Sequence, residues 1–271
     1  MANAILGTPI YSDLGVLYTP ALSGGSWQSA LPLANLQDRR LAVVARSTDA
    51  TTGSTQFVID LGVARAVRLV ALVAHNLSSA ATVTVKAGSD GVTWPYSSGS
   101  FTPWPAGLTA EDLVGLNWPV LHIPASVQTY RYWQVLIVDT GNAAGYVQAG
   151  RLCVCGGYQP TLNLSPGAKV GIETDTVRTV TDGGAAIYLT KPIRRTWAFT
   201  LSDTPEAEAF GSAWKLQRLL GTSGQLFFVY DPADAVAMWE RSFLAVLKAL
   251  TALDAPYAGR FGVPFQLVEE L

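Results

Sequence analysis

Apolar and polar residues alternate with a period of two through much of the first 160 residues, which predicts β-strands. Segment 82–88 alternates most clearly, with Val83, Val85 and Ala87 on one face. Short turn signals separate the predicted strands, and this arrangement favours an antiparallel sandwich or jelly roll. Six strands are predicted in this half: 56–62, which should end at Gly62, then 67–75, 82–88, 120–124, 132–139 and 147–155.

The stretch from Trp94 to Trp118 breaks this pattern with several prolines and glycines. It is predicted to be a long aromatic loop at one end of the sandwich. Because such loops commonly carry binding residues, its rings are the candidates for carbohydrate binding or another contact. The alternative is that the rings only pin the loop onto the sandwich. The candidate residues are Trp94, Tyr96, Phe101 and Trp104.

The pattern changes near residue 160, where 162–167 is predicted to be a linker. Segment 239–250 fits either a helix or a strand, and we favour a strand because a partner strand, 260–269, follows it. The other strands predicted in this half are 170–174, 177–181, 186–190, 195–201 and 225–230, with a turn at Asp182, Gly183 and Gly184.

One helix is predicted between the strands 195–201 and 225–230. Thr204 is expected to cap it, Pro205 to take its first position and Gly221 to end it. An apolar face at helical spacing is predicted from Phe210, Ala213, Trp214, Gln217 and Leu220.

These elements predict a mainly β chain in three parts. Residues 1–24 form an extended N-terminal arm, and 25–160 form an antiparallel jelly roll or β-sandwich. Residues 161–271 form a smaller β-sandwich with one α-helix.

Composition narrows the function classes. The chain has 271 residues, of which 49% are apolar and 14% charged, with a formal net charge of −2. The low charge content fits either a surface covered by partners or a large sandwich core. Nucleic-acid binding requires a cluster of Lys and Arg residues, and the sequence contains no such cluster, so this function class is set aside. No apolar run reaches the length of a membrane span, and no signal peptide is recognised, so synthesis in a cytosol is expected.

The residues that carry chemistry are few. Cys153 and Cys155, two apart in a strand, are expected to be reduced thiols, because a disulfide across that spacing is strained. His75 and His122 each stand alone, so a metal site is not expected and both are predicted to be structural. The carboxylates Asp60 and Asp139 are predicted to form turns, and Glu111 and Asp112 lie in a loop. We therefore expect no catalytic, cofactor or metal site, and no enzyme activity.

A resemblance follows from four segments in order: 33–47, with its Asn-Leu-x-Asp-x-Arg run, 57–62 ending in Asp-Leu-Gly, 67–78 ending in His-Asn-Leu-Ser, and 89–94. The last resembles the Ser-x-Asp-Gly-x-x-Trp turn of discoidin-type domains. Together they look like the galactose-binding-like (discoidin-type) jelly roll found in bacteriophage tail proteins, and the resemblance covers about 25–158.

The second half is similar in element order to small phage tail and baseplate proteins, which share a tube-like β-sandwich with one helix. The segments that carry this likeness are 194–201, the helix, 224–230 and 259–271.

The two resemblances imply a virion protein of the tail tip, a distal-tail-like structural subunit assembled in the host cytoplasm. Its implied partners are the tail tube, hub and baseplate proteins and further copies of itself in a ring. An adhesin that binds a host-surface glycan is the alternative, and a polysaccharide or cell-wall hydrolase is a third hypothesis.

Overall fold

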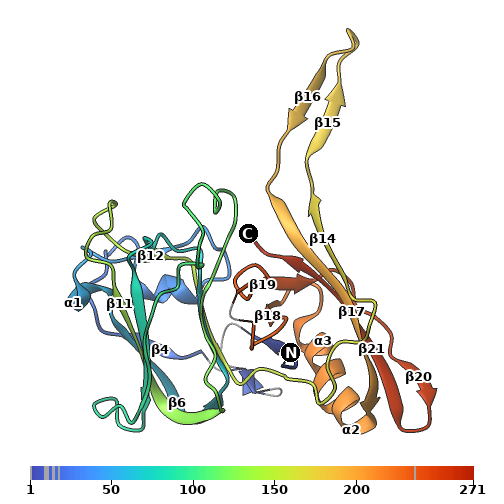
Figure 1. Cartoon of the computed structure of the whole chain (residues 1–271), viewed down its shortest axis with the longest axis horizontal. Helices are drawn as coiled ribbons and strands as arrows, with labels where there is room; N and C mark the ends of the chain where they lie inside the picture. Colours follow the sequence, from blue (N-terminus) through green and yellow to red (C-terminus); the bar gives the residue numbers. More distant parts are fainter. Residues whose placement is uncertain (1, 9–11, 14–15, 18, 235) are drawn as a thin grey trace. The chain divides into compact units, whose positions relative to one another are not determined.

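The computed structural model describes residues 2–8, 12–13, 16–17, 19–234 and 236–271. The chain is mainly β, as the alternation predicts, and it divides into two units (Figure 1). Unit 1 comprises Met1–Gln159 and Leu226–Phe243, and unit 2 comprises Pro160–Gln225 and Leu244–Leu271. Residues 1, 9–11, 14–15 and 18 of the predicted N-terminal arm lie outside the described residues.

Unit 1 contains a sandwich of two antiparallel sheets, with five and three strands. Apolar side chains from both sheets, among them Phe57, Leu72, Trp133 and Leu152, meet in one buried cluster. Burial of side chains of this size is the main driving force for such a sandwich. The five-stranded sheet runs β4 (Ala21–Ser23), β6 (Phe57–Val67), β11 (Gln128–Val138), β8 (Thr82–Gly88), β9 (Tyr96–Phe101), and the three-stranded sheet runs β10 (Val120–His122), β7 (Leu69–Val73), β13 (Arg151–Cys155).

Short elements complete this part of the chain. They are β2 (Ser12–Asp13) paired with β3 (Val16–Leu17), β5 (Ala45–Arg46) paired with β12 (Gln148–Ala149), the 3-10 helix η1 (Leu33–Gln37) and the helix α1 (Thr52–Thr55).

The predicted strand 82–88 is confirmed in both bounds, but the end predicted for the strand 56–62 is wrong. β6 passes through Gly62 and continues to Val67. Gly62 adopts φ +75°, and the pairing with β11 shifts register between Tyr130 and Tyr132. A glycine at positive φ permits such a bulge, so the Asp-Leu-Gly run bends the strand instead of ending it.

The predicted loop 94–118 is wrong in part. Its segment Tyr96–Phe101 is β9, an edge strand paired with β8. The pairing is irregular between Thr84 and Lys86, and Gly99 adopts φ +68°. Edge strands tolerate such interruptions, and this is why the sequence pattern there resembles a loop.

The seven-stranded sheet runs β1, β18, β19, β21, β17, β14, with β20 paired to β21. β19 lies within 239–250, so the favoured strand is confirmed there, and β21 matches the predicted 260–269. The bounds are β1 (Ile5–Gly7), β14 (Lys169–Thr174), β17 (Ile193–Pro205), β18 (Gln225–Val229), β19 (Ser242–Leu247), β20 (Asp254–Tyr257) and β21 (Arg260–Glu269).

The predicted helix is present, but its start and its apolar face differ from the prediction. β17 runs to Pro205, and the buried Thr204 hydroxyl donates to the Leu201 carbonyl instead of capping the helix. Gly221 ends the helix at φ +56°, as predicted. The segment consists of α2 (Glu206–Glu208), the π-helix η2 (Ala209–Trp214) and α3 (Lys215–Leu220).

A π turn holds one extra residue, and this rotates the side chains that follow it. The buried side is therefore formed by Ala209, Ala213, Leu216, Gln217 and Leu220. Phe210 and Trp214, which the sequence places on the predicted apolar face of the helix, are 44% and 41% exposed.

In unit 2, the pair β14 and β17 continues into the two-stranded ribbon β15 (Val177–Val180) and β16 (Ala186–Leu189). Figure 1 shows this ribbon extending well beyond the other strands of the unit. We call residues 170–193 the exposed hairpin.

Candidate functional site

The four candidate rings do not gather in one site. Tyr96 and Phe101 lie on β9 and pack against the core of the sandwich. The Tyr96 hydroxyl shares a 2.7 Å hydrogen bond with Nε2 of His122, and the Phe101 ring stacks on His122 at 5.8 Å. Desolvation by burial lowers the pKa of His122 to about 4, so this imidazole is neutral at pH 7. These two rings therefore belong to a structural cluster.

Trp104 also packs inward. Its ring meets Trp118 edge-on at 5.3 Å, and its indole N–H donates to the Leu108 carbonyl at 2.9 Å. Trp118 in turn contacts His75 at 4.2 Å between ring centroids. These contacts are those expected of a ring that pins the loop onto the sandwich.

Trp94 is different. It is half-buried and follows a turn that Asp90 organises by accepting hydrogen bonds from the amides of Val92 and Thr93. The same hydrogen bonds lower the pKa of Asp90 and keep it ionised. This turn fixes the backbone just before Trp94. Of the four candidates, Trp94 alone is not packed against the core cluster in the described part of unit 1.

The histidines and carboxylates make structural contacts. Nδ1 of His75 accepts from the Leu77 amide at 3.3 Å, and desolvation by burial lowers the pKa of His75 to about 4. Asp60 holds Arg131 through two hydrogen bonds, at 2.8 and 2.9 Å. Asp139 accepts from the amide and hydroxyl of Ser78.

The two thiols lie side by side. Cys153 and Cys155 are buried and free, with their sulfurs 4.0 Å apart. Burial raises the pKa of the Cys153 thiol well above its usual value, so it stays protonated and unreactive. Among the described residues, no group of three His, Cys, Asp or Glu side chains is placed to hold a metal ion. No helix in the described part of the chain is both long and apolar enough to cross a bilayer.

Two surface hollows are small. One, of about 250 Å³, is lined in part by Arg68, Ser126 and Gln159, and the other, of about 230 Å³, by Lys169, Phe199 and Gln266. Pockets for small molecules usually enclose about 300–1,000 Å³.

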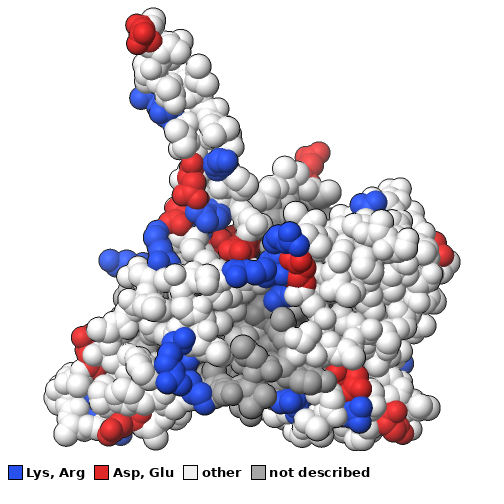
Figure 2. Space-filling model, turned by 180° about the vertical axis from the view of Figure 1, so that it is seen from behind, with Lys and Arg blue, Asp and Glu red and all other residues white. Residues whose placement is uncertain are grey.

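The most unusual surface is the exposed hairpin. Apolar side chains normally line one face of a strand and are covered. Here they remain in water on both strands, and in Figure 2, where the hairpin is the projection at upper left, most of its surface is uncharged. The exposed fractions are Val170 64%, Ile172 72%, Val177 52%, Val180 50%, Ile187 59%, Tyr188 59%, Leu189 59% and Ile193 60%.

The register sorts these side chains by face. Val177 lies opposite Leu189, and Thr179 opposite Ile187, so these four share one face of the ribbon. Residues directly opposite in an antiparallel pair point the same way. A second layer over this face would remove three large apolar side chains from water.

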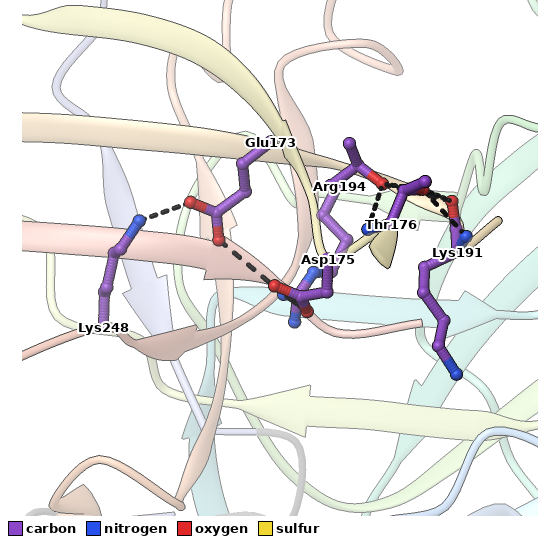
Figure 3. Close-up of polar contacts among 7 residues, drawn as sticks. Glu173, Asp175, Thr176, Lys191, Arg194 and Lys248 are labelled. Carbon is purple, nitrogen blue, oxygen red and sulfur yellow. Dashed lines mark hydrogen bonds and ion pairs between the residues drawn. The ribbon is translucent and has the colours of Figure 1, made fainter. Parts of the chain in front are cut away.

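The root of the exposed hairpin is held by charges (Figure 3). Glu173 forms an ion pair with Lys248, and its Oε1 lies 3.8 Å from Nη2 of Arg194. Arg194 also forms an ion pair with Asp175. The Lys191 amide donates to the Thr176 hydroxyl at 3.0 Å. These contacts fix the direction in which the hairpin leaves the sheet.

Sequence reasoning predicted the strands of this hairpin but not its exposure. The available signal was the occurrence of apolar residues on both faces of a short hairpin, as at Val177 and Val180, which point to opposite sides. A hairpin covered on one side would show a polar outer face.

No protein-family model matches the sequence, and no curated protein matches it. Solved structures similar to this chain include the family 32 carbohydrate-binding module of NanJ from Clostridium perfringens, in complex with galactose. The identity is 16% and the TM-score 0.38, with 50% of this chain and 92% of that chain covered. Another is CBM32-1 of a family 31 glycoside hydrolase from Clostridium perfringens. Its identity to this chain is 16% and the TM-score is 0.36, with 50% of this chain and 92% of that chain covered.

A fucose-binding module from Streptococcus pneumoniae gives 14% identity and a TM-score of 0.36, with 54% of this chain and 93% of that chain covered. The binding of galactose and of fucose is named for those modules and not for this chain.

Proposed function

We propose that this chain is a structural subunit of the tail tip or baseplate of a tailed bacteriophage and works by binding other tail proteins through its surfaces. The observation that carries the proposal is the exposed hairpin. A two-stranded ribbon is at best marginally stable alone in water and gains stability from a covering layer. Large uncovered apolar patches mark interaction sites.

The phage assignment rests on the segment likeness at 33–47, 57–62, 67–78 and 89–94 and on the element order of the second half. The proposed partners are tail tube, hub and baseplate proteins together with further copies of this chain in a ring. The proposed location is the tip of the virion tail, after assembly in the host cytoplasm.

This proposal is tested on particles. The gene is disrupted in its phage, and purified particles from the parent and the mutant are compared by mass spectrometry and electron microscopy. The chain is expected in parent particles at a fixed copy number, and the mutant is expected to lack a complete tail tip. Intact, infectious mutant particles, or parent particles free of the chain, would refute the proposal.

A second candidate function is carbohydrate binding by the sandwich of unit 1, as in a host-surface adhesin. The observation that favours it is the half-buried Trp94, which follows the fixed turn at Asp90 and lies outside the core cluster. A free aromatic face is the usual platform for the apolar side of a sugar ring.

The full chain is applied to a glycan array that includes galactose and fucose, the sugars named for two of the similar modules. Binding is expected to disappear with Trp94→Ala and to persist with Val92→Ala, a matched change on the same turn at a side chain that is 79% exposed. A silent array, or binding that survives Trp94→Ala, would reject the sugar site.

A further inference from the structure

The hollow of about 250 Å³ in unit 1 has a single charged side chain among the described residues that line it, that of Arg68. Arg68 joins the end of β6 to the start of β7, and its backbone amide donates to the Cys155 carbonyl at 2.9 Å. β6 belongs to the five-stranded sheet and β7 to the three-stranded sheet. The backbone of this arginine is therefore fixed where the two sheets of the sandwich are connected.

Gln159 fixes the side chain of Arg68. Its Nε2 donates to the Asn3 carbonyl at 2.8 Å, so its Oε1 faces Arg68 and accepts from Nη1 of the guanidinium. Gly157, at φ +65°, lets Ile5 and the arginine stem approach closely. A Cβ at Gly157 would lie 2.8 Å from Cγ2 of Ile5 and 3.8 Å from Cδ of Arg68. The guanidinium is thus held in place without a ligand, and such preorganisation lowers the cost of binding one.

The other edge of the guanidinium, formed by Nε and Nη2, is not used. Nε of Arg68 is buried and has no hydrogen-bond partner. Within the described residues, the side chain of Arg68 makes one hydrogen bond, through Nη1, and no ion pair. A buried donor on a charged group is unfavourable when it lacks an acceptor. The site as built is short of an acceptor at this edge.

Elsewhere in the chain, the same edge of arginine binds carboxylates. Arg131 holds Asp60 through Nε at 2.8 Å and Nη2 at 2.9 Å. Arg195 holds Glu269 through the same two nitrogens. The two parallel donors match the spacing of the two oxygens of a carboxylate. Arg68 therefore presents an edge suited to a carboxylate that the described residues do not supply.

The lining of the hollow selects the kind of carboxylate. Ile5, Ile123 and Val127 contribute apolar surface, and Ser126 adds a hydroxyl. The volume of about 250 Å³ equals that of roughly eight water molecules, which is room for a carboxylate on a short aliphatic group. A phosphate carries more charge and more acceptor oxygens than one guanidinium edge and one hydroxyl can satisfy.

We propose that this hollow binds a carboxylate carried on a short aliphatic group, whose two oxygens accept hydrogen bonds from Nε and Nη2 of Arg68. A free short-chain acid and the C-terminus of a polypeptide both present this chemistry. No described lining residue belongs to the exposed hairpin or is one of the four candidate rings. The site therefore stands or fails independently of the proposed function.

The test is a titration of the full chain with butyrate, followed by ¹H–¹⁵N NMR that includes the arginine Nε–H signals. Binding is expected to saturate with a dissociation constant on the order of 1 mM. The Arg68 Nε–H signal, identified by its loss in Arg68→Lys, is expected to move downfield as it gains an acceptor. Butyramide, which has the same size and no charge, is expected to cause no saturable change.

A second titration uses N-acetyl-alanylvaline and its C-terminal amide. Stronger binding of the peptide acid than of butyrate supports a polypeptide C-terminus as the ligand, and the reverse supports a free acid. Inorganic phosphate is expected to bind more weakly than either acid. Tighter binding of phosphate than of both acids would overturn the assignment of a carboxylate.

The variant Arg68→Lys keeps the positive charge but lacks the two-donor edge, so it is expected to bind butyrate about tenfold more weakly or worse. The matched control is Arg178→Gln, a change at an exposed arginine of the hairpin, which should leave binding unaltered. A wild type that binds neither acid, equal binding of butyrate and butyramide, or unaltered binding by a folded Arg68→Lys overturns the inference. If Arg68→Lys does not fold, a wild-type Nε–H signal of Arg68 that stays in place at saturation overturns it, and its downfield movement supports it.

Discussion

Arg195 on β17 and Glu269 on β21 form a buried ion pair at the root of the exposed hairpin. The Arg195 amide donates to Oε2 of Glu269 at 3.0 Å, its Nε donates to the same oxygen at 2.8 Å, and its Nη2 donates to Oε1. Only 12% of the Arg195 side chain and 4% of the Glu269 side chain are exposed. One carboxylate therefore binds both the backbone and the side chain of the strand that carries the hairpin.

Removing one partner of the ion pair between Arg195 and Glu269 should lower the stability of unit 2. Glu269→Leu leaves the Arg195 guanidinium buried without its carboxylate, and we expect unit 2 to lose about 3–5 kcal/mol of unfolding free energy. Urea titration and hydrogen exchange of β17 and β21 measure the loss. The control is Asp38→Ala, which breaks the exposed pair with Arg40 and should change nothing measurable. Equal effects of the two substitutions would contradict the role given to Glu269.

Gly7 on β1 lies directly against Cys155. A Cβ added at Gly7 would overlap the Cys155 sulfur, so Gly7→Ala should destabilise unit 1 by about 1–3 kcal/mol. Gly53→Ala is the control, because a Cβ there meets open space. Thermal unfolding of the double variant with Cys155→Ala should recover much of the loss. No recovery would show that the overlap is not the cause.

Stability should fall with acid between pH 6.5 and 4. The pKa of both His75 and His122 is lowered by burial from 6.5 to about 4, so protonation favours the unfolded chain. The stabilisation is complete above pH 6.5 and is lost as pH falls towards 4, by up to about 3 kcal/mol per histidine. Urea midpoints across this range measure it. His122→Leu should roughly halve the dependence, and an unchanged slope would contradict the assigned burial.

The two tryptophans of the aromatic segment should respond differently. Trp104→Ala removes the ring that packs on Trp118 and should cost about 2–3 kcal/mol of stability. Trp94→Ala, outside the core cluster, should leave the unfolding midpoint within experimental error. Chemical denaturation of both variants measures these changes in stability. Similar losses of stability in the two variants would show that Trp94 packs in the core.

The parts of the fold that the sequence predicts well are those where one face is buried by local alternation, such as 82–88 and 260–269. The π turn at Ala209–Trp214 was missed, because an extra residue in a turn leaves no mark in apolar spacing. β9 was missed because an edge strand needs no regular pattern.

The same holds for the candidate site residues, whose type is visible in the sequence but whose surroundings are not. Sequence identified Tyr96, Phe101 and Trp104 as aromatic loop residues, but whether a ring faces water or core depends on distant partners such as His122 and Trp118. The exposure of Ile172 and Ile187 was equally hidden, since apolar residues in strands are usually covered. Local pattern predicts a strand, and only tertiary packing shows what covers it.

The central claim is that the exposed hairpin is covered when copies of this chain assemble. Hydrogen–deuterium exchange of the full chain, followed by mass spectrometry of peptides from 177–189 at dilute and at concentrated conditions, tests it most directly. Peptides from 177–189 are expected to exchange fast in the dilute chain and at least tenfold more slowly in the assembled one, while peptides of β8 exchange at the same rate in both. Equal, fast exchange of 177–189 in an assembled sample would contradict it.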